Sequence, residues 1–101
     1  MIIYNVTVNI EDSVHDEWLA WMKQTHIPDV MRTGKFSSSR LLRILGDEDS
    51  GGKTYSVQYS CNNIKDFQEY EHDHAQALRA EFNAKFKDKF VAFRTLLESV
   101  D

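Results

Sequence analysis

The sequence contains few of the residues that cross-link a chain or interrupt its helices and strands. Its 101 residues include one cysteine, one proline and four glycines. A lone thiol cannot form a disulfide within the chain, which is typical of proteins in reducing compartments. No stretch approaches the roughly 20 apolar residues of a membrane-spanning helix, and the first residues lack the basic and apolar regions of a signal peptide. We therefore expect a cytoplasmic protein with no membrane partner.

Positive charge is also scarce. The chain has 12 Lys and Arg against 16 Asp and Glu, a formal net charge of -4. Nucleic-acid-binding domains usually present a basic face, so we expect no nucleic-acid partner. The length suits one domain, residues 1–101, and a hydrophobic content of 42% is enough for a core. Such a core is thin, so dimerisation would help to stabilise it.

The first half of the chain predicts a strand followed by a helix. Residues 2–10 alternate between apolar and polar side chains, which is the period of a half-buried strand. An apolar stripe at helical spacing follows over residues 13–26. Pro28 disfavours helical backbone at Ile27, so we expect the helix to end there. Pro28 then opens a short turn with Gly34 as its stop.

The middle of the chain predicts a hairpin. A strand is expected over residues 36–45, where Arg40 and Arg43 interrupt the apolar rows as charges do in an edge strand. Residues 46–52 contain three glycines and no apolar side chain, which predicts the hairpin loop. Residues 53–61 alternate cleanly and predict the returning strand.

The last part of the chain predicts a second helix and a fourth strand. Asn62 or Asn63 can cap a helix that runs to about residue 86. Residues 90–100 are first β-branched and aromatic and then rich in leucine, and they predict the final strand.

The order of these elements predicts an α+β, ferredoxin-like fold, βαββαβ, with a four-stranded antiparallel sheet and two helices on one face. The other face of the sheet would be polar. Its expected side chains are Asn5, Thr7, Asn9, Thr54, Ser56, Gln58 and Ser60. This face either meets water or covers the same face of a second copy in a homodimer.

Four segments together resemble an uncharacterised bacterial family, the domain of unknown function numbered 4286. They are EWLAWMKQTHIPDVMRTGKF, TYSVQY, HDHAQALRAEF and FVAFRTLLE. The resemblance extends from Met1 to about Val100, and the family is similar to the wider dimeric α/β-barrel group. It implies a ferredoxin-like protomer whose sheet packs against that of a twofold partner.

The resemblance to the wider group is compatible with several functions. It includes small oxygenases that act on quinols or haem, isomerases, and proteins of unknown role. In those enzymes the pocket usually lies between the sheet and the helices of one protomer. This is a likeness of fold, and no motif in the sequence assigns the chain to a catalytic branch.

Glu71 interrupts the apolar stripe of the second predicted helix. A carboxylate there must be paired or protonated. His74 follows three residues later and is close in angle, so the two form a possible acid/base pair. The alternative, which we favour, is a structural role, in which Glu71 either extends to solvent at the helix edge or forms an ion pair with Arg94 or Arg79.

His26 has two interpretations. At the end of the first predicted helix it would interact with the negative helix terminus, which is the favoured reading. It could instead line a pocket mouth as a hydrogen-bond donor or general base.

Aromatic side chains offer further candidates. Trp18 and Trp21 most simply belong to the core, but with Tyr55 and Tyr59 they could also form walls around a flat ligand. The side chains that we expect to contact such a ligand are Trp18, His26, Tyr55, Tyr59, Glu71, His74 and Arg94.

The sequence predicts neither a metal nor a cofactor. His72 and His74 diverge by about 200° on a helix and cannot hold one ion together. The Glu71 and His74 spacing occurs in carboxylate-bridged iron sites, but those need carboxylates from more helices than are expected here. Nucleotide-binding and hydrolase motifs are absent.

Three functions remain open at this stage. The first is a dimeric module that binds a small organic ligand between helices and sheet. The second is a cofactor-independent oxygenase or isomerase that uses Glu71, His74 or His26. The third is a purely structural dimer.

Overall fold

Two central strands pair along their whole length and carry the rest of the fold. The structure is a computed structural model that describes residues 1–46 and 51–101. Strands β1 (Ile2–Glu11) and β3 (Gly52–Cys61) pair antiparallel, with β2 (Ser38–Arg43) beside β3 and β4 (Phe90–Glu98) beside β1. The sheet order is β2-β3-β1-β4, so the prediction of an edge strand at Arg40 and Arg43 is confirmed. The predicted hairpin loop spans residues 46–52, and its residues 47–50 lie outside the described residues.

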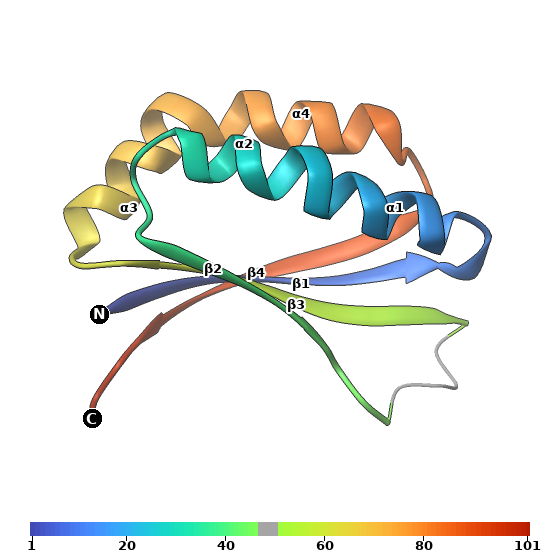
Figure 1. Ribbon diagram of the computed structural model, residues 1–101, viewed down its shortest axis with the longest axis horizontal. Helices are drawn as coiled ribbons and strands as arrows, with labels where there is room; N and C mark the ends of the chain where they lie inside the picture. The colour runs from blue at the N-terminus through green and yellow to red at the C-terminus, as the bar shows by residue number, and fades with distance from the viewer. Residues whose placement is uncertain (47–50) are drawn as a thin grey trace.

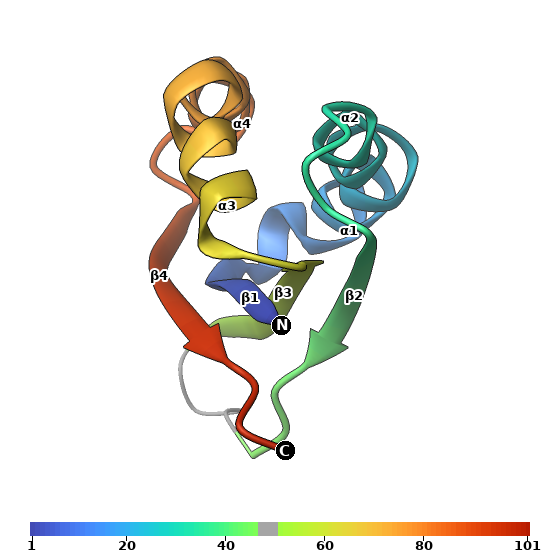
Figure 2. The same ribbon diagram turned by 90° about the vertical axis from the view of Figure 1, so that its left-hand side faces the viewer.

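Two long helical segments cover the same face of the sheet (Figures 1 and 2). The first consists of a short 3-10 turn (Asp12–Val14), α1 (His15–Trp21), a π-helical turn (Met22–His26) and α2 (Ile27–Arg32). The second consists of α3 (Ile64–Tyr70), a π-helical turn (Glu71–Ala75) and α4 (Gln76–Lys85). The predicted ferredoxin-like architecture is therefore confirmed.

The prediction that the first helix ends before Pro28 is wrong. Ile27 has helical backbone angles, and the segment continues to Arg32. A proline inside a helix normally loses a hydrogen bond and its ring collides with the preceding turn. Here the π-helical turn widens the helix just before the proline, and the Ile27 N–H donates to the Met22 carbonyl five residues back. Gly34, at φ 77°, does provide the predicted stop.

The alternation of the central strands separates the two faces of the sheet as predicted. Tyr4 lies opposite Tyr59 and Val6 opposite Val57, on the side covered by the helices. Most core side chains on this side are buried, and the rings of Tyr4, Tyr59 and Phe36 stack within about 6 Å of one another, at 6.2, 6.1 and 5.3 Å. This aromatic layer forms one end of the space between helices and sheet.

Polar side chains on the other face bond to one another. Asn5 donates to the Thr7 hydroxyl at 3.1 Å and accepts a hydrogen bond from Ser56, to which Gln58 donates at 3.2 Å. Asn5 is largely buried already in one chain. Because these groups hydrogen-bond to one another, covering this face would leave few polar groups without a hydrogen-bond partner.

Of the two predicted helix caps, Asn63 is the one used. Its side chain accepts a hydrogen bond from the Asp66 N–H at 3.0 Å. Replacing an asparagine cap by alanine costs about 1 kcal/mol. We expect Asn63→Ala to lower the free energy of unfolding by about this amount in urea denaturation. Asn62→Ala, one residue earlier and exposed, is the control. Equal losses in the two variants would contradict the assignment.

Candidate functional site

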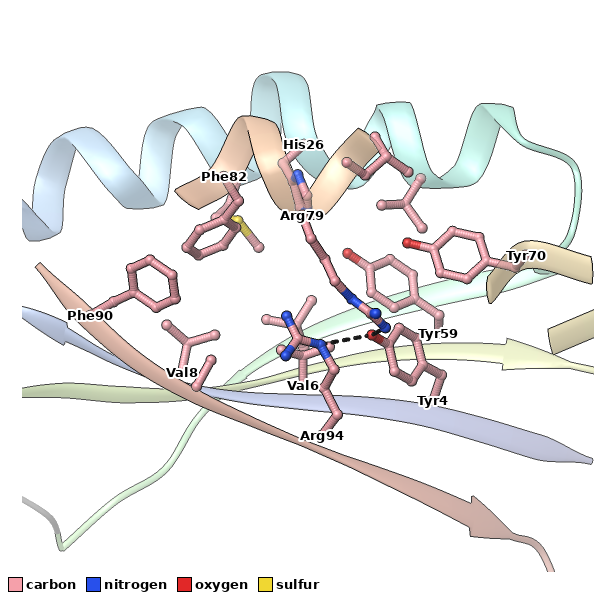
Figure 3. Close-up of a pocket in the computed structure, with 15 residues that line it drawn as sticks. Tyr4, Val6, Val8, His26, Tyr59, Tyr70, Arg79, Phe82, Phe90 and Arg94 are labelled. Carbon is pink, nitrogen blue, oxygen red and sulfur yellow. Dashed lines mark hydrogen bonds between the residues drawn. The ribbon is translucent and has the colours of Figure 1, made fainter. Parts of the chain in front are cut away.

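A pocket lies between the sheet and both helical segments (Figure 3). The space free of atoms inside it is about 470 Å³, including the part open to solvent, and only a few water molecules fit without side-chain movement. The side chains that line it are Tyr4, Val6, Val8, Met22, His26, Val30, Val57, Tyr59, Tyr70, Leu78, Arg79, Phe82, Phe90, Ala92 and Arg94. Every strand except the edge strand β2 contributes to it.

The pocket has a polar end and an apolar end. In Figure 3, Val8, Phe82 and Phe90 gather at one end, and the tyrosines and arginines gather at the other. The Tyr4 hydroxyl accepts hydrogen bonds from Arg79 Nη2 at 2.9 Å and from Arg94 Nε at 3.1 Å. These contacts join β1, α4 and β4 at one oxygen atom.

Several polar atoms in the pocket have no protein partner. Four buried side-chain nitrogen or oxygen atoms lack one among the described residues, and three belong to the pocket: His26 Nδ1, the Tyr59 hydroxyl and Arg79 Nε. Leaving such a group unpaired costs about 1–3 kcal/mol. Water or a ligand that enters the pocket can satisfy them.

Burial keeps the pocket's titratable rings neutral. It raises the pKa of Tyr59 well above its ordinary value, and nearby Tyr70 and Tyr4 raise it further. The pKa of Tyr70 is also raised, mainly by burial. Burial lowers the pKa of His26 to about 4. At neutral pH the imidazole and both phenols therefore act as uncharged hydrogen-bonding groups.

His26 does not lie at a helix terminus, so that interpretation is wrong. It belongs to the π-helical turn inside a continuous helical segment, and it is 9% exposed. Its ring stacks on Trp21, with centroids 4.9 Å apart, and meets the edge of Phe82 at 5.4 Å. A charged imidazole would be costly in this apolar contact, which is why the ring is neutral. The other interpretation, a pocket-lining donor or base, agrees with its position and stays a prediction.

Glu71 makes the ion pair that the sequence allowed with Arg79. It does not line the pocket itself, but its partner does. His74 lies outside the pocket lining, with its ring 6.4 Å from that of Tyr70. The structure therefore brings neither residue to the pocket as an acid/base pair, and a direct ligand contact by either stays a prediction.

Trp18 and Tyr55 lie together, away from the pocket lining. Trp18 is fully buried, and its ring centroid is 5.0 Å from that of Tyr55. The Tyr55 hydroxyl hydrogen-bonds to His15 Nε2 at 2.7 Å, and His15 Nδ1 lies 2.8 Å from an Asp16 oxygen. Of the proposed aromatic walls, only Tyr59 lines the pocket. Arg94, from the predicted set, lines it as well.

Sequence reasoning missed Tyr4, Tyr70 and Phe82 as pocket residues, and it named Arg79 only as a partner of Glu71. A helical wheel at 100° per residue assumes regular α-helix, whereas each π-helical turn shifts the wheel by about one residue. Glu71, a polar residue inside the apolar stripe of the second helix, was the available signal of that shift.

The uncovered face of the sheet also carries exposed apolar side chains that the sequence analysis did not use. On β4, Val91 and Phe93 lie opposite Asn9 and Thr7 and are 72% and 62% exposed. On β2, Leu42 lies opposite Ser56 and is 38% exposed. Exposed apolar groups thus flank the polar centre of this face on both edge strands.

The chain belongs to the family described as Domain of unknown function (DUF4286), whose profile matches residues 1–100. No curated protein matches the chain. Among the described residues, no helix is long and apolar enough to cross a membrane, and no three His, Cys, Asp or Glu side chains gather as metal ligands.

Solved structures share the fold. A dimeric ferredoxin-like protein from an uncultured marine organism has a TM-score of 0.73 at 8% identity, covering 100% of this chain and 96% of its own. An ethyl tert-butyl ether d (ethd) family protein from Bacillus halodurans has a TM-score of 0.65 at 16% identity, covering 99% and 100%. A second dimeric ferredoxin-like protein from an uncultured marine organism reaches 0.56 at 12% identity, covering 99% and 97%. At these identities the likeness concerns the fold.

The burial of His26 predicts a pH-dependent stability. Its folded pKa of about 4 lies below the ordinary 6.5, so protonation favours the unfolded chain. The stabilisation of the folded chain by the neutral, buried imidazole is complete above pH 6.5 and is lost as the pH falls through 4. Between these values we expect the free energy of unfolding to fall by up to about 3 kcal/mol more in wild type than in His26→Gln.

Urea denaturation at a series of pH values measures this difference. His72→Gln is the control, because that imidazole is exposed and its pKa is raised by the hydrogen bond to Asp73. Because a raised pKa stabilises the folded chain as the pH falls, this variant should show a loss at least as large as wild type. A His26→Gln variant with the same pH slope as wild type would show that the buried imidazole does not titrate as described.

Proposed function

We propose that the protein is a cytoplasmic homodimer that binds a small organic molecule in the pocket between its helices and sheet. The observation that carries the proposal is the set of unpartnered polar atoms on side chains that line this space. His26 Nδ1, the Tyr59 hydroxyl and Arg79 Nε each lack a hydrogen-bond partner within residues 1–46 and 51–101. A cavity that served only the core would be filled by apolar side chains or lined by satisfied groups.

The form of the pocket supports the same proposal. Ligand sites are usually concave and mostly apolar, with a few polar groups that fix orientation. Here Val8, Phe82 and Phe90 form the apolar part, while tyrosine and arginine side chains form the polar part. Both π-helical turns lie beside the pocket, at His26 and next to Tyr70. Such turns often occur at functional sites.

The uncovered sheet face supports the homodimer. Its central side chains, Asn5, Thr7, Asn9, Ser56 and Gln58, are the interface predicted from the sequence. The exposed apolar side chains of the edge strands extend that surface on both sides. A twofold partner would cover apolar groups with apolar groups, and the mutually bonded polar centre would remain satisfied. Two structures with the same fold are described as dimeric.

Filling the pocket should displace its ligand. We expect native mass spectra of the protein, purified gently from its own host, to show a defined small mass on each protomer. Ala92→Leu adds bulk to the pocket lining and should remove that mass. Ala80→Leu, exposed on α4, is the matched control and should retain it. Absence of any retained mass from wild type, or its survival in Ala92→Leu, would contradict a ligand in this pocket.

A charge on the uncovered sheet face should separate the protomers. We expect wild type to be a dimer at micromolar concentration and Phe93→Asp to raise the dimer dissociation constant about a hundredfold. Light scattering coupled to gel filtration measures the mass. Leu96→Asp is the control, because Leu96 lies opposite Tyr4 on the helix side of the same strand and is 44% exposed. A monomeric wild type, or equal effects of the two substitutions, would refute this interface.

A further inference from the structure

The polar end of the pocket contains more positive than negative charge. Arg79 and Arg94 both bond to the Tyr4 hydroxyl, but only Arg79 has a carboxylate partner, Glu71. Among the residues that the structure describes, Arg94 makes no ion pair. His26, with its pKa lowered to about 4 by burial, adds no charge at neutral pH. Two guanidinium groups against one carboxylate leave one positive charge uncompensated.

The hydroxyl groups at this end lack acceptors. Tyr4 uses its oxygen to accept from both arginines, so its own O–H remains to donate. The Tyr59 hydroxyl, on a side chain that is 2% exposed, has no hydrogen-bond partner among the residues that the structure describes. Figure 3 shows Tyr59 and Tyr70 directing their hydroxyls into the part of the pocket that Arg79 crosses. Arginine and phenol donors converge here, an arrangement that favours a negatively charged acceptor.

The other end of the pocket defines the rest of the ligand. Val8, Phe82 and Phe90 offer apolar contacts only, and the ring of Phe82 meets that of Phe90 edge-on at 4.6 Å. A fully polar anion such as inorganic phosphate would leave this end unused. A ligand with a planar or aliphatic body and one anionic group at its end satisfies both parts of the pocket.

We propose that the pocket binds a small monoanionic organic acid, with its carboxylate held by Arg94, Arg79 and the Tyr4 hydroxyl and its apolar body packed against Val8, Phe82 and Phe90. This inference rests on the proposed ligand-binding function and names its ligand class. A carboxylate fits because guanidinium groups donate to its two oxygens in a fixed planar geometry. Its single charge balances the uncompensated arginine.

Three probes that share a phenyl ring test the charge. Benzoate, benzamide and benzylammonium share a ring but carry negative, neutral and positive groups. Amide NMR titrations of the dimer at pH 7 give each dissociation constant and locate each probe from the shifted residues. We expect benzoate to shift the pocket residues and to bind at least about tenfold more tightly than benzamide, because charge-assisted hydrogen bonds are the stronger ones. We expect benzylammonium to bind most weakly.

Variants assign the preference to Arg94. Arg94 is exposed, so Arg94→Gln should fold, and its unchanged benzamide affinity verifies this. We expect Arg94→Gln to weaken benzoate about tenfold and Arg94→Lys to weaken it less, since lysine keeps the charge but loses the planar fork. Arg43→Gln is the control, because Arg43 is exposed on β2 and does not line the pocket.

The outcomes separate the two proposals. Equal binding of benzoate and benzamide in the pocket, or a benzoate preference that survives Arg94→Gln, would overturn the carboxylate site while leaving small-molecule binding intact. Stronger binding of inorganic phosphate than of benzoate would overturn the assignment of an apolar acid. If none of the probes shifts a pocket residue at millimolar concentration, both proposals fail for ligands of this size.

Discussion

Tyr4 opposite Tyr59 and Val6 opposite Val57 mark the register on which the molecule depends. Side chains in a strand alternate between faces, so a slip of one residue would move every one of them to the other side. In the observed register β1 and β3 present aromatic and aliphatic groups to the helices and mutually bonded amides and hydroxyls to the open face. The pocket and the proposed dimer surface are the two sides of this single arrangement.

The helices add what the sheet cannot supply. Each contains a π-helical turn beside the pocket, and each turn rotates the following residues by about one position. In the second helix, the turn Glu71–Ala75 begins at Glu71, and this residue forms an ion pair with Arg79 in the α-helix that follows the turn. Arg79 also donates a hydrogen bond to the Tyr4 hydroxyl, and Arg94 on β4 donates a second one to the same oxygen. A polar cluster is thus held inside a largely apolar space by residues from three elements.

The two faces suggest a division of roles. The helix side holds the unpartnered polar atoms, so ligand binding is proposed there. The open side holds exposed apolar groups around satisfied polar ones, so self-association is proposed there. If the open faces of the two sheets pack against each other, the pocket of each protomer lies on the opposite side of its sheet. Dimerisation would then stabilise a thin core without occupying the ligand site.

The sequence by itself determined the fold, because strand alternation, an asparagine cap at residue 62 or 63, the Gly34 stop and the charged edge strand are local signals with local causes. It also identified the Glu71 and Arg79 pair as one alternative. Only the tertiary structure decided that the helix continues through Pro28, that His26 is neutral among rings, and that Tyr55 bonds to His15 instead of lining the pocket. These outcomes depend on helix phase and on contacts between residues far apart in the chain, which periodicity along one element cannot encode.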